Sequence, residues 1–442
     1  MKLFGTDGVR GRVEDFLTPE LAFGLGRAAA TAFKGDSPQV LVVRDTRASG
    51  EMLESALCAG IAAGGGSALL AGVLPTPAAS ILVRRLGLDM AAVISASHNP
   101  YWDNGIKFFD KQGQKFSDDA ESAVEEMVLA SAPGIAGGRV RAIAGTLEDY
   151  LRELASRFNP NLDGLRVLLD CANGATYRAA PLIFERLGAS IETIACEPSG
   201  TNINDGCGST HAEVMVEALS RTDCDIAFAF DGDGDRVLAA DRSGRIVDGD
   251  EIIARIALHL HATGKLAGDG VAVTVMTNYG FHQAMEGARI EVATTKVGDR
   301  YVVEELFERG WILGGEQSGH IIDLRFTPSG DGIAAALELL EALGGRDLGE
   351  VEVMRKYPQS VLNVPVRDRD SLEASSSVWE AVAAESEALE GRGRVLVRPS
   401  GTEPVVRVMA EAPTKEESEA VVGRIAQIVD RELGSAPSPS GS

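Results

Sequence analysis

Short apolar runs alternate with segments of helical spacing along most of the chain. The runs are three to six residues long, as buried strands are, and apolar positions three and four apart between them predict amphipathic helices. This repeated strand–helix–strand order favours layered α/β domains with mostly parallel sheets, in which functional loops follow the carboxyl ends of the strands. The predicted strands are 40–43, 68–71, 91–94, 167–169, 226–230, 271–276 and 311–313, and the predicted helices include 19–33, 51–63 and 77–86.

The last quarter of the chain follows a different pattern and predicts a small α+β domain. Two strands, 394–397 and 405–410, lie between helices at 377–389 and 415–433. Three breaks mark candidate domain boundaries. The first is an Ala-, Gly-, Pro- and Ser-rich segment at 130–145, which leads into a predicted interdomain helix at 147–157. The second lies near 248–251 and the third near 358–365. We therefore expect domains at 1–149, 150–249, 250–362 and 363–434, followed by a disordered tail at 435–442.

Composition agrees with a folded multidomain enzyme and excludes some partners. With 442 residues the chain is long enough for three or four cores, since domains average about 150 residues. A formal net charge of −23 argues against nucleic acid and against anionic membranes, both of which would repel the protein. The start of the chain has no apolar leader and no run of 18 apolar residues occurs, so we expect a cytoplasmic protein. The five cysteines show no metal-ligand spacing and are predicted to be reduced.

Three acidic residues at alternate positions directly follow the apolar run 226–230. Asp231, Asp233 and Asp235 are separated by glycines that let the backbone curl, so that the three carboxylates can converge. Their mutual repulsion is tolerable only with a cation among them, and a hard divalent metal suits oxygen ligands. A calcium EF-hand is excluded because Arg236 stands where that loop requires glycine.

A second loop supplies a candidate anionic ligand for that metal. Residues 95–100 (Ser-Ala-Ser-His-Asn-Pro) also follow an apolar strand, and their Asn-Pro turn presents Ser97 and His98 at its end. A phosphoryl group on Ser97 would carry a charge of about −2 and complete the metal shell. Lys107 follows as a proton-transfer candidate, although by spacing alone it is equally a surface lysine, and the Ser-His-Asn-Pro run alone could be a simple turn.

Three further loops carry groups suited to a phosphosugar. Residues 398–404 combine Arg398, Ser400, Gly401 and Thr402 between two strands, with Arg407 after them, which makes an anion cradle unless the segment is a plain hairpin. Residues 315–320 offer Glu316 and Ser318 for sugar hydroxyls and His320 for proton transfer, a weak signal by itself. The N-terminal loop 4–11 carries Arg10. No nucleotide-phosphate loop of the GxxxxGK[ST] or strand-linked GxGxxG kind is present, so the phosphoryl group must come from elsewhere.

Together these loops resemble the α-D-phosphohexomutase superfamily from Phe4 to Arg407. The resemblance implies three similar α/β domains and a smaller, mobile C-terminal α+β domain around a central cleft, with one loop from each domain. Gln317 and the stretches 296–302 and 202–210 resemble the branch that acts on glucosamine phosphates more than the branches for mannose or glucose phosphates. The activity implied is that of an isomerase of amino-sugar metabolism, whose product feeds cell-wall precursor synthesis.

The resemblance also implies a set of roles. Phosphorylated Ser97 gives its phosphoryl group to glucosamine 6-phosphate, which forms glucosamine 1,6-bisphosphate. The bisphosphate returns its 6-phosphoryl group to Ser97 and leaves glucosamine 1-phosphate. One Mg²⁺ per chain is held by Ser97 and the three aspartates. Lys107 and His320 are the proton-transfer candidates, His98 orients the phosphoserine, and Arg236 and Arg10 stabilise charge. Glu316 and Ser318 bind the sugar, and Arg398 to Thr402 with Arg407 hold the second phosphate. A phosphosugar is the expected partner, and a homodimer is possible.

Two other classes of function stay open on the sequence. A metal-dependent sugar phosphatase would hydrolyse its phosphoenzyme and release inorganic phosphate, but the aspartyl-phosphatase pattern expects Thr or Val where this chain has Asp235. A non-catalytic phosphosugar sensor would bind ligand without converting it. Within the superfamily, a phosphomannomutase or phosphoglucomutase is the alternative.

Overall fold

The computed structural model describes residues 3–5, 7–33, 37–130, 137–400 and 403–434, and the chain divides into two compact units. Unit 1 comprises residues 1–276 and 288–353, and unit 2 comprises 277–287 and 354–442. The tail predicted at 435–442 lies outside the described residues. Within the described part of the chain, no helix combines the length and the apolar character needed to cross a bilayer.

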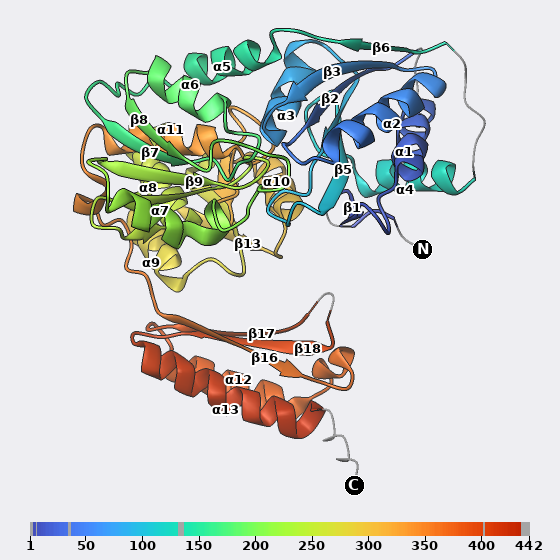
Figure 1. The fold of residues 1–442 in the computed structure, drawn as a ribbon. Coiled ribbons are helices and arrows are strands. Elements are labelled where there is room, and N and C mark those ends of the chain that lie inside the picture. The colour runs from blue at the N-terminus through green and yellow to red at the C-terminus, as the bar shows by residue number, and fades with distance from the viewer. Residues whose placement is uncertain (1–2, 6, 34–36, 131–136, 401–402, 435–442) are drawn as a thin grey trace. The chain divides into compact units, whose positions relative to one another are not determined.

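The first sheet of unit 1 contains six strands (Figure 1). Strands β2, β3, β4 and β6 are parallel, and β5 and β1 join one edge antiparallel. Apolar residues that alternate along the strands pack with helices α1, α2 and α4 in one core. Across the sheet the strands are β1 (Val9–Arg12), β5 (Asp103–Asp110), β4 (Met90–Ile94), β2 (Gln39–Arg44), β3 (Ser67–Val73) and β6 (Arg139–Ala142), with helices α1 (Pro19–Ala32), α2 (Gly50–Ala63), α3 (Thr76–Arg85) and α4 (Asp118–Leu129).

Helices α1 and α2 pack at close range because glycines face one another. A Cβ atom on Gly26 would lie 2.2 Å from the carbonyl oxygen of Leu57, and one on Gly60 would lie 2.0 Å from that of Phe23. Only glycine leaves room for this approach of two helix backbones. The pair packs in the same core as residues of β2 and β4.

The second and third sheets of unit 1 are also mixed. In the second sheet β8, β7 and β9 are parallel, and β10 and β11 follow antiparallel. In the third sheet β13, β12 and β14 are parallel, and β15 closes the edge antiparallel. The second sheet runs β11 (Ile246–Val247), β10 (Val237–Asp241), β9 (Ile226–Phe230), β7 (Arg166–Asp170) and β8 (Ser190–Ile194), and the third runs β13 (Glu291–Thr295), β12 (Gly270–Thr274), β14 (Leu313–Gly315) and β15 (Ile321–Asp323). The helices beside them are α5 (Thr146–Arg157), α6 (Ala179–Arg186), α7 (Ala212–Leu219), α8 (Gly249–Ala262), α10 (Asp299–Arg309) and α11 (Gly332–Leu343).

Unit 2 is built on a three-stranded antiparallel sheet (Figure 1). Val406, Val408 and Ala410 of its central strand pack against Val421 and Ile425 in one core. The strands are β16 (Gln359–Pro365), β18 (Val405–Glu411) and β17 (Arg394–Pro399), and the helices are α12 (Ser376–Ala388), α13 (Lys415–Leu433) and α9 (Tyr279–Ala288), whose last residue belongs to unit 1. The predicted α+β character of the C-terminal region is confirmed.

Several segments differ from the sequence predictions. The strand predicted at 311–313 is displaced to 313–315, because Trp311 packs over Gly270, where a Cβ atom would lie 2.1 Å from the indole ring. Strand β5 was not predicted, because its Asn104-Gly105 pair is typical of a turn. The segments predicted as breaks at 130–145 and 358–365 contain β6 and β16. The domain boundaries drawn from those breaks stay a prediction.

Candidate active site

Ser97 lies in the loop that follows β4 and is almost fully buried. Its backbone has a φ of 51°, in the left-handed region that residues other than glycine seldom adopt. The loop is braced locally, since the Ser97 N–H donates to the hydroxyl of Ser95 at 3.0 Å. A strained residue held by its surroundings at the end of a buried strand is typical of a catalytic position.

A buried ion pair that the sequence analysis missed holds this loop in place. Arg47 and Asp45 follow β2, are buried, and pair at 2.9 Å. Arg47 also donates to the carbonyl oxygens of Ser97 and Asn99, each at 2.8 Å. Asn204 donates to the same two carbonyls at 2.9 and 3.0 Å. The only sequence signal was the position of Asp45 and Arg47 at the end of a predicted strand.

The acidic triplet follows β9 and meets the Ser97 loop. The hydroxyl of Ser97 donates to Asp231 Oδ2 at 2.6 Å, although 134 residues separate the two in the chain. Asp231, Asp233 and Asp235 are all buried, and one oxygen of each lies within 4.8 Å of the others. The structure therefore brings together all four residues that were predicted to hold a metal.

The electrostatics of the triplet fit a bound cation. Burial raises the pKa of Asp231 well above its usual range, and the neighbouring Asp235 and Asp233 add to the effect. Among the described residues, Asp233 Oδ1 is buried and has no hydrogen-bond partner. A divalent cation would neutralise the three charges and take up that oxygen, and the all-oxygen donor set suits Mg²⁺.

Lys107 is a buried member of the site and not a surface lysine. Its ammonium group donates to Asp233 Oδ2 at 2.9 Å, and it lies 4.0 Å from Asp235 and 3.6 Å from Asp7. Burial by itself would lower the pKa of Lys107, but the attraction of Asp233 and Asp7 outweighs it and raises the pKa. Thr76 donates a second hydrogen bond to Asp233 Oδ2 at 2.6 Å, so this oxygen is firmly placed.

His98, Arg236 and Arg10 lie around the same loop. His98 Nδ1 is 3.3 Å from the Ser97 hydroxyl and 3.3 Å from Arg236 Nη1. Arg10 reaches the carbonyl oxygen of Ala96 at 3.4 Å and pairs with Asp7. Burial lowers the pKa of His98, and the nearby Arg236 and Arg10 lower it further. The two guanidinium groups thus contact the residues on either side of Ser97.

His320 is also brought to the site, from the third sheet. It is buried, with Nδ1 3.5 Å from Asp235 Oδ1, and its Nε2 accepts from the Gly330 N–H at 3.1 Å. Asp299, which the sequence analysis did not single out by itself, lies 3.5 Å from Nε2. Burial would lower the pKa of His320, but Asp235 and Asp299 outweigh it and raise the pKa.

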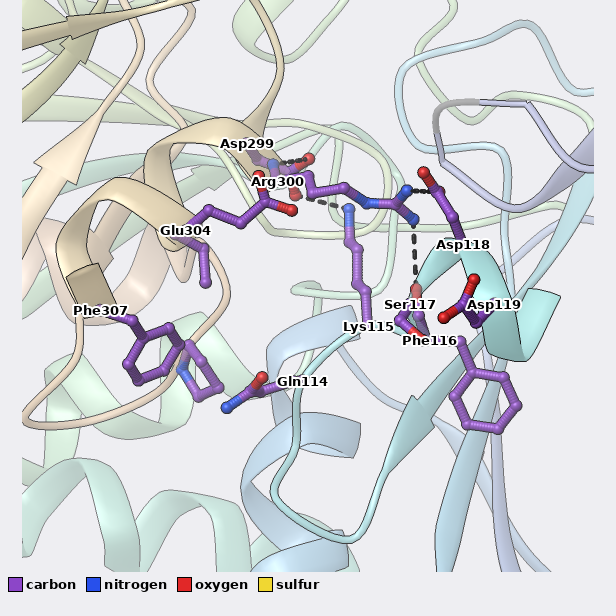
Figure 2. A pocket seen from close by; sticks show the side chains of 12 residues that line it. Gln114, Lys115, Phe116, Ser117, Asp118, Asp119, Asp299, Arg300, Glu304 and Phe307 are labelled. Carbon is purple, nitrogen blue, oxygen red and sulfur yellow. Dashed lines mark hydrogen bonds and ion pairs between the residues drawn. The ribbon is translucent and has the colours of Figure 1, made fainter. Parts of the chain in front are cut away.

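Lys115 and Asp299 join the segment after β5 to the start of α10 (Figure 2). The ammonium group of Lys115 donates to Asp299 Oδ2 at 2.6 Å and also pairs with Asp7. Arg300, the next residue of α10, pairs with Asp118 and donates to the Phe116 carbonyl at 3.1 Å. These contacts line a cavity of about 340 Å³ between residues 114–119 and α10. Asp299 and Lys115 therefore position His320, and no periodicity in the sequence indicated the pair.

The predicted sugar-binding residues lie on an open loop between β14 and β15. Glu316 accepts from the Gly298 N–H at 3.0 Å, and the exposed Ser318 lies 3.5 Å from the other Glu316 oxygen. Gly319 is required here, because its φ is 91° and a Cβ atom would lie 2.2 Å from the Val237 carbonyl. This close contact joins the loop to β10, the strand that follows the acidic triplet.

The predicted phosphate loop belongs to unit 2. Arg398 and Arg407 are direct cross-strand neighbours on β17 and β18, so two guanidinium groups lie side by side. Burial lowers the pKa of Arg398, and Arg407 lowers it further. Ser400 is buried, and Arg369, which the sequence analysis missed, donates to its carbonyl at 2.6 Å. Gly401 and Thr402 lie outside the described residues.

Family models match the chain in four consecutive segments. They are described as the phosphoglucomutase/phosphomannomutase α/β/α domains I, II and III and the C-terminal domain, and they match residues 1–133, 148–244, 248–359 and 361–428. The chain therefore belongs to the phosphoglucomutase/phosphomannomutase family, the phosphohexomutases.

Two curated relatives narrow this assignment. A phosphoglucosamine mutase of Moorella thermoacetica is 49% identical over 438 residues, covering 97% of this chain and 99% of the relative. One of Brevibacillus brevis is 46% identical over 445 residues, covering 98% and 99%. Within the phosphohexomutases, the chain belongs with the phosphoglucosamine mutases.

Solved structures share the fold over nearly the whole chain. A phosphoglucomutase/phosphomannomutase family protein of Burkholderia thailandensis has a TM-score of 0.84 at 23% identity, covering 97% of both chains. An N-acetylphosphoglucosamine mutase of Aspergillus fumigatus, solved with GlcNAc-6P and magnesium, has a TM-score of 0.70 at 18% identity, covering 98% of this chain and 96% of that one. The predicted four-part phosphohexomutase architecture is confirmed.

Proposed function

We propose that this protein interconverts glucosamine 6-phosphate and glucosamine 1-phosphate through a phosphorylated Ser97. The observation that carries the proposal is the 2.6 Å contact between the Ser97 hydroxyl and Asp231, which joins a nucleophile to an acidic cluster in a buried site. The choice of amino sugar rests on relatives up to 49% identical over nearly the full chain. An isomerase needs no other substrate, which agrees with the lack of a nucleotide-phosphate loop in the sequence.

The residues proposed to hold Mg²⁺ are Ser97, Asp231, Asp233 and Asp235. Their support is the converging buried oxygens and the Asp233 oxygen that lacks a partner among the described residues. A bound Mg²⁺ supplies charge neutralisation to phosphoryl oxygens, which lowers the cost of bringing a phosphorylated serine next to three carboxylates.

Phosphoryl transfer proceeds in two steps in the proposed reaction. Phosphorylated Ser97 transfers its phosphoryl group to the 1-hydroxyl of glucosamine 6-phosphate, which yields glucosamine 1,6-bisphosphate and a free Ser97 hydroxyl. The bisphosphate then turns over, and its 6-phosphoryl group passes back to Ser97 to leave glucosamine 1-phosphate. Because such transfers pass through loose transition states, alignment of the reacting groups and charge stabilisation by Arg236 and Arg10 dominate the rate enhancement.

Two buried groups are assigned to proton transfer. The attacking sugar hydroxyl loses a proton and the departing Ser97 oxygen gains one. Lys107 and His320 both contact the acidic cluster from separate sheets, and the raised pKa of each favours the protonated form, which can donate to that oxygen. His98, at 3.3 Å from the Ser97 hydroxyl, is assigned to orienting the phosphoserine.

Substrate binding is assigned to two loops. Glu316 and Ser318 bind sugar hydroxyls, supported by their place on an open loop directly before His320. Arg398, Ser400 and Arg407 bind the phosphate that is not transferred, supported by the cross-strand placement of the two arginines beside Ser400. Gly401 and Thr402 are assigned to the same phosphate-binding loop from their positions in the sequence. A cytoplasmic location and a homodimer stay predictions.

Replacement of Ser97 by alanine tests the phosphoenzyme. The purified wild-type protein incubated with glucosamine 1,6-bisphosphate should gain the mass of one phosphoryl group, whereas Ser97→Ala should gain none and should lose turnover. Ser55→Ala, which changes an exposed serine of α2, is the matched control and should behave as wild type. Substantial turnover by Ser97→Ala would remove the proposed mechanism.

Substrate comparison tests the sugar and the reaction class. Turnover of glucosamine, glucose and mannose 6-phosphates, followed by ³¹P NMR, should be fastest for glucosamine 6-phosphate. A faster reaction with mannose or glucose phosphate would place the enzyme in another branch. Release of inorganic phosphate as the main product would indicate a phosphatase.

A further inference from the structure

Asp170 is a buried carboxylate near the candidate active site that the proposed mechanism does not use. It is the last residue of β7 and is fully buried. Its Oδ1 accepts from the Ala172 N–H at 2.9 Å, and its Oδ2 accepts from the Gly208 N–H at 2.8 Å. A buried carboxylate is costly unless its oxygens are hydrogen-bonded, so each oxygen binds one of two segments that are distant in the chain.

The two segments that Asp170 joins meet again at Asn204. The Asn204 N–H donates to the Ala172 carbonyl at 3.0 Å. The side-chain amide of Asn204 donates to the carbonyls of Ser97 and Asn99 at 2.9 and 3.0 Å. A short path of hydrogen bonds therefore runs from Asp170 through Ala172 and Asn204 to the loop that carries Ser97.

The backbone of both segments adopts conformations that need support. Ala172 and Asn204 have left-handed backbones, with φ of 53° and 57°. Gly208 has a φ of 76°, and a Cβ atom there would lie 2.6 Å from the carbonyl oxygen of Phe230, the residue before Asp231. Residues in sparsely populated backbone regions persist only when their surroundings hold them there, and the buried carboxylate supplies two of these contacts.

We propose that Asp170 is a positioning residue of the phosphoryl-transfer reaction, which acts through Asn204 to hold the carbonyls of the Ser97 loop in place. This inference rests on the proposed function, since Ser97 is the group whose alignment is affected. It also gives the stretch 202–210 a role in the reaction. Asn204 supports the Ser97 loop at one end of that stretch, and Gly208 binds it to Asp170 at the other.

Replacement of Asp170 by asparagine removes one of the two acceptor oxygens. The asparagine side chain presents one carbonyl oxygen and one NH₂ group, so the N–H of either Ala172 or Gly208 loses its acceptor. We expect kcat to fall about 10-fold, because a small displacement at a phosphoryl-transfer centre disturbs alignment. KM should change by less than about 2-fold, since the loops assigned to the sugar and to the second phosphate follow other strands.

The stability of this variant separates positioning from a purely structural role. Burial raises the pKa of Asp170 to about 6, so the charged carboxylate costs the folded protein free energy that asparagine does not. The thermal unfolding temperature of Asp170→Asn should therefore stay close to that of the wild type while kcat falls. A variant that does not fold, or whose loss of kcat accompanies a general loss of stability, would show a structural role and overturn the proposal.

A double-mutant cycle tests whether Asp170 acts through Asn204. The kcat for glucosamine 6-phosphate is measured for the wild type, Asp170→Asn, Asn204→Ala and the double variant. If the two residues act in series, the double variant should lose about 10-fold, no more than the worse single variant. Losses that multiply to about 100-fold would show that the two residues act independently, and the proposal would be wrong.

Asp225→Asn is the matched control. Asp225 accepts from the Arg166 N–H at 2.9 Å, at the opposite end of β7 from Asp170. It thus makes the same kind of contact in the same sheet, away from the Ser97 loop. Asp225→Asn should keep the wild-type kcat, and a loss as large as that of Asp170→Asn would show that any weakening of this sheet lowers turnover.

Hydrogen exchange tests the contacts without reference to activity. Peptides that cover 95–100 and 202–210 should exchange faster in Asp170→Asn than in the wild type, whereas peptides of α1 should exchange equally in both. Unchanged exchange at 95–100 would refute the proposed path whatever the turnover. If Ser97→Ala kept its turnover, the proposed function would fail, but faster exchange at 95–100 would still show that Asp170 holds this loop.

Discussion

Asp331 caps the N-terminus of α11 from a fully enclosed position and provides a quantitative test of the structure. Its carboxylate accepts from the Ala334 N–H at 3.0 Å and from the hydroxyl of Tyr150 at 2.9 and 3.0 Å. Burial nevertheless raises the pKa of Asp331 from its ordinary 3.8 to about 7. The folded protein therefore holds a proton on this group that the unfolded chain loses at much lower pH.

The sign and size of the effect on stability follow from these two values. Below pH 3.8 both states are protonated, and the group has no effect on the free energy of unfolding. As pH rises, the Asp331 carboxyl ionises in the unfolded chain but stays protonated in the folded protein. The free energy of unfolding therefore falls, and this fall levels off above about pH 7. With about 1.4 kcal/mol for each tenfold change, the cost is about 1 kcal/mol at pH 4.5 and about 4 kcal/mol at pH 8.

The perturbation that tests this is Asp331→Asn. Asparagine is isosteric, caps helices well, and can accept both hydrogen bonds, but it cannot ionise. Hydrogen exchange of α11 peptides, corrected for intrinsic rates, reports the free energy of opening this helix without assuming that the whole chain unfolds in one step. The advantage of the variant over wild type should grow by about 3 kcal/mol between pH 4.5 and pH 8.

Asp368→Asn is the matched control, since Asp368 caps a short helix from an exposed position. Asp368→Asn should leave the hydrogen exchange of α11 at its wild-type level at both pH values. Equal protection of α11 in Asp331→Asn and wild type at both pH values would refute the assignment of a protonated, buried Asp331.

Three further substitutions test the site. Asn204→Ala should lower kcat by about 10-fold in a steady-state assay, because the catalytic loop loses two of the hydrogen bonds to its carbonyls; unchanged kcat would show that Arg47 suffices. Arg407→Ala should raise KM by about 10-fold or more with little change in kcat, whereas Arg424→Ala, on the same unit, should change neither; equal effects would contradict the phosphate site. Magnesium at 100 times its Kd should stabilise the wild type by about 2.7 kcal/mol in thermal unfolding, and Asp233→Asn should lose most of this gain; equal stabilisation of both would place the ion elsewhere.

Local patterns predicted those elements whose signals lie within one segment. The apolar run before Asp231 and the glycines after it predicted a buried strand and a converging loop, and both are present. The Asn-Pro turn after β4 likewise predicted where Ser97 would be presented. Strand β5 was missed because its Asn104-Gly105 pair resembles a turn, and only pairing with β4 and β1 on both sides makes it a strand.

The supporting groups of the site were not predictable, because their partners are far away in the chain. Arg47 contacts carbonyls 50 and 52 residues away, and Lys115 contacts Asp299 across 184 residues. Neither has a spacing that distinguishes it from a surface residue. Removing an ion pair from water costs free energy, and only good geometry with further hydrogen bonds offsets this cost. Buried charged groups such as these are therefore held in fixed positions and can hold their neighbours in place.

By itself, the sequence determined the chemistry available to this protein: an acidic triplet, a serine at the end of a strand, and a pair of arginines, each specified by residue type and local spacing. Tertiary structure alone decided that Ser97 meets Asp231 and that Lys107 is buried against Asp233. The physical reason is that side-chain chemistry is local, whereas proximity and burial arise from the packing of sheets that are distant in the chain.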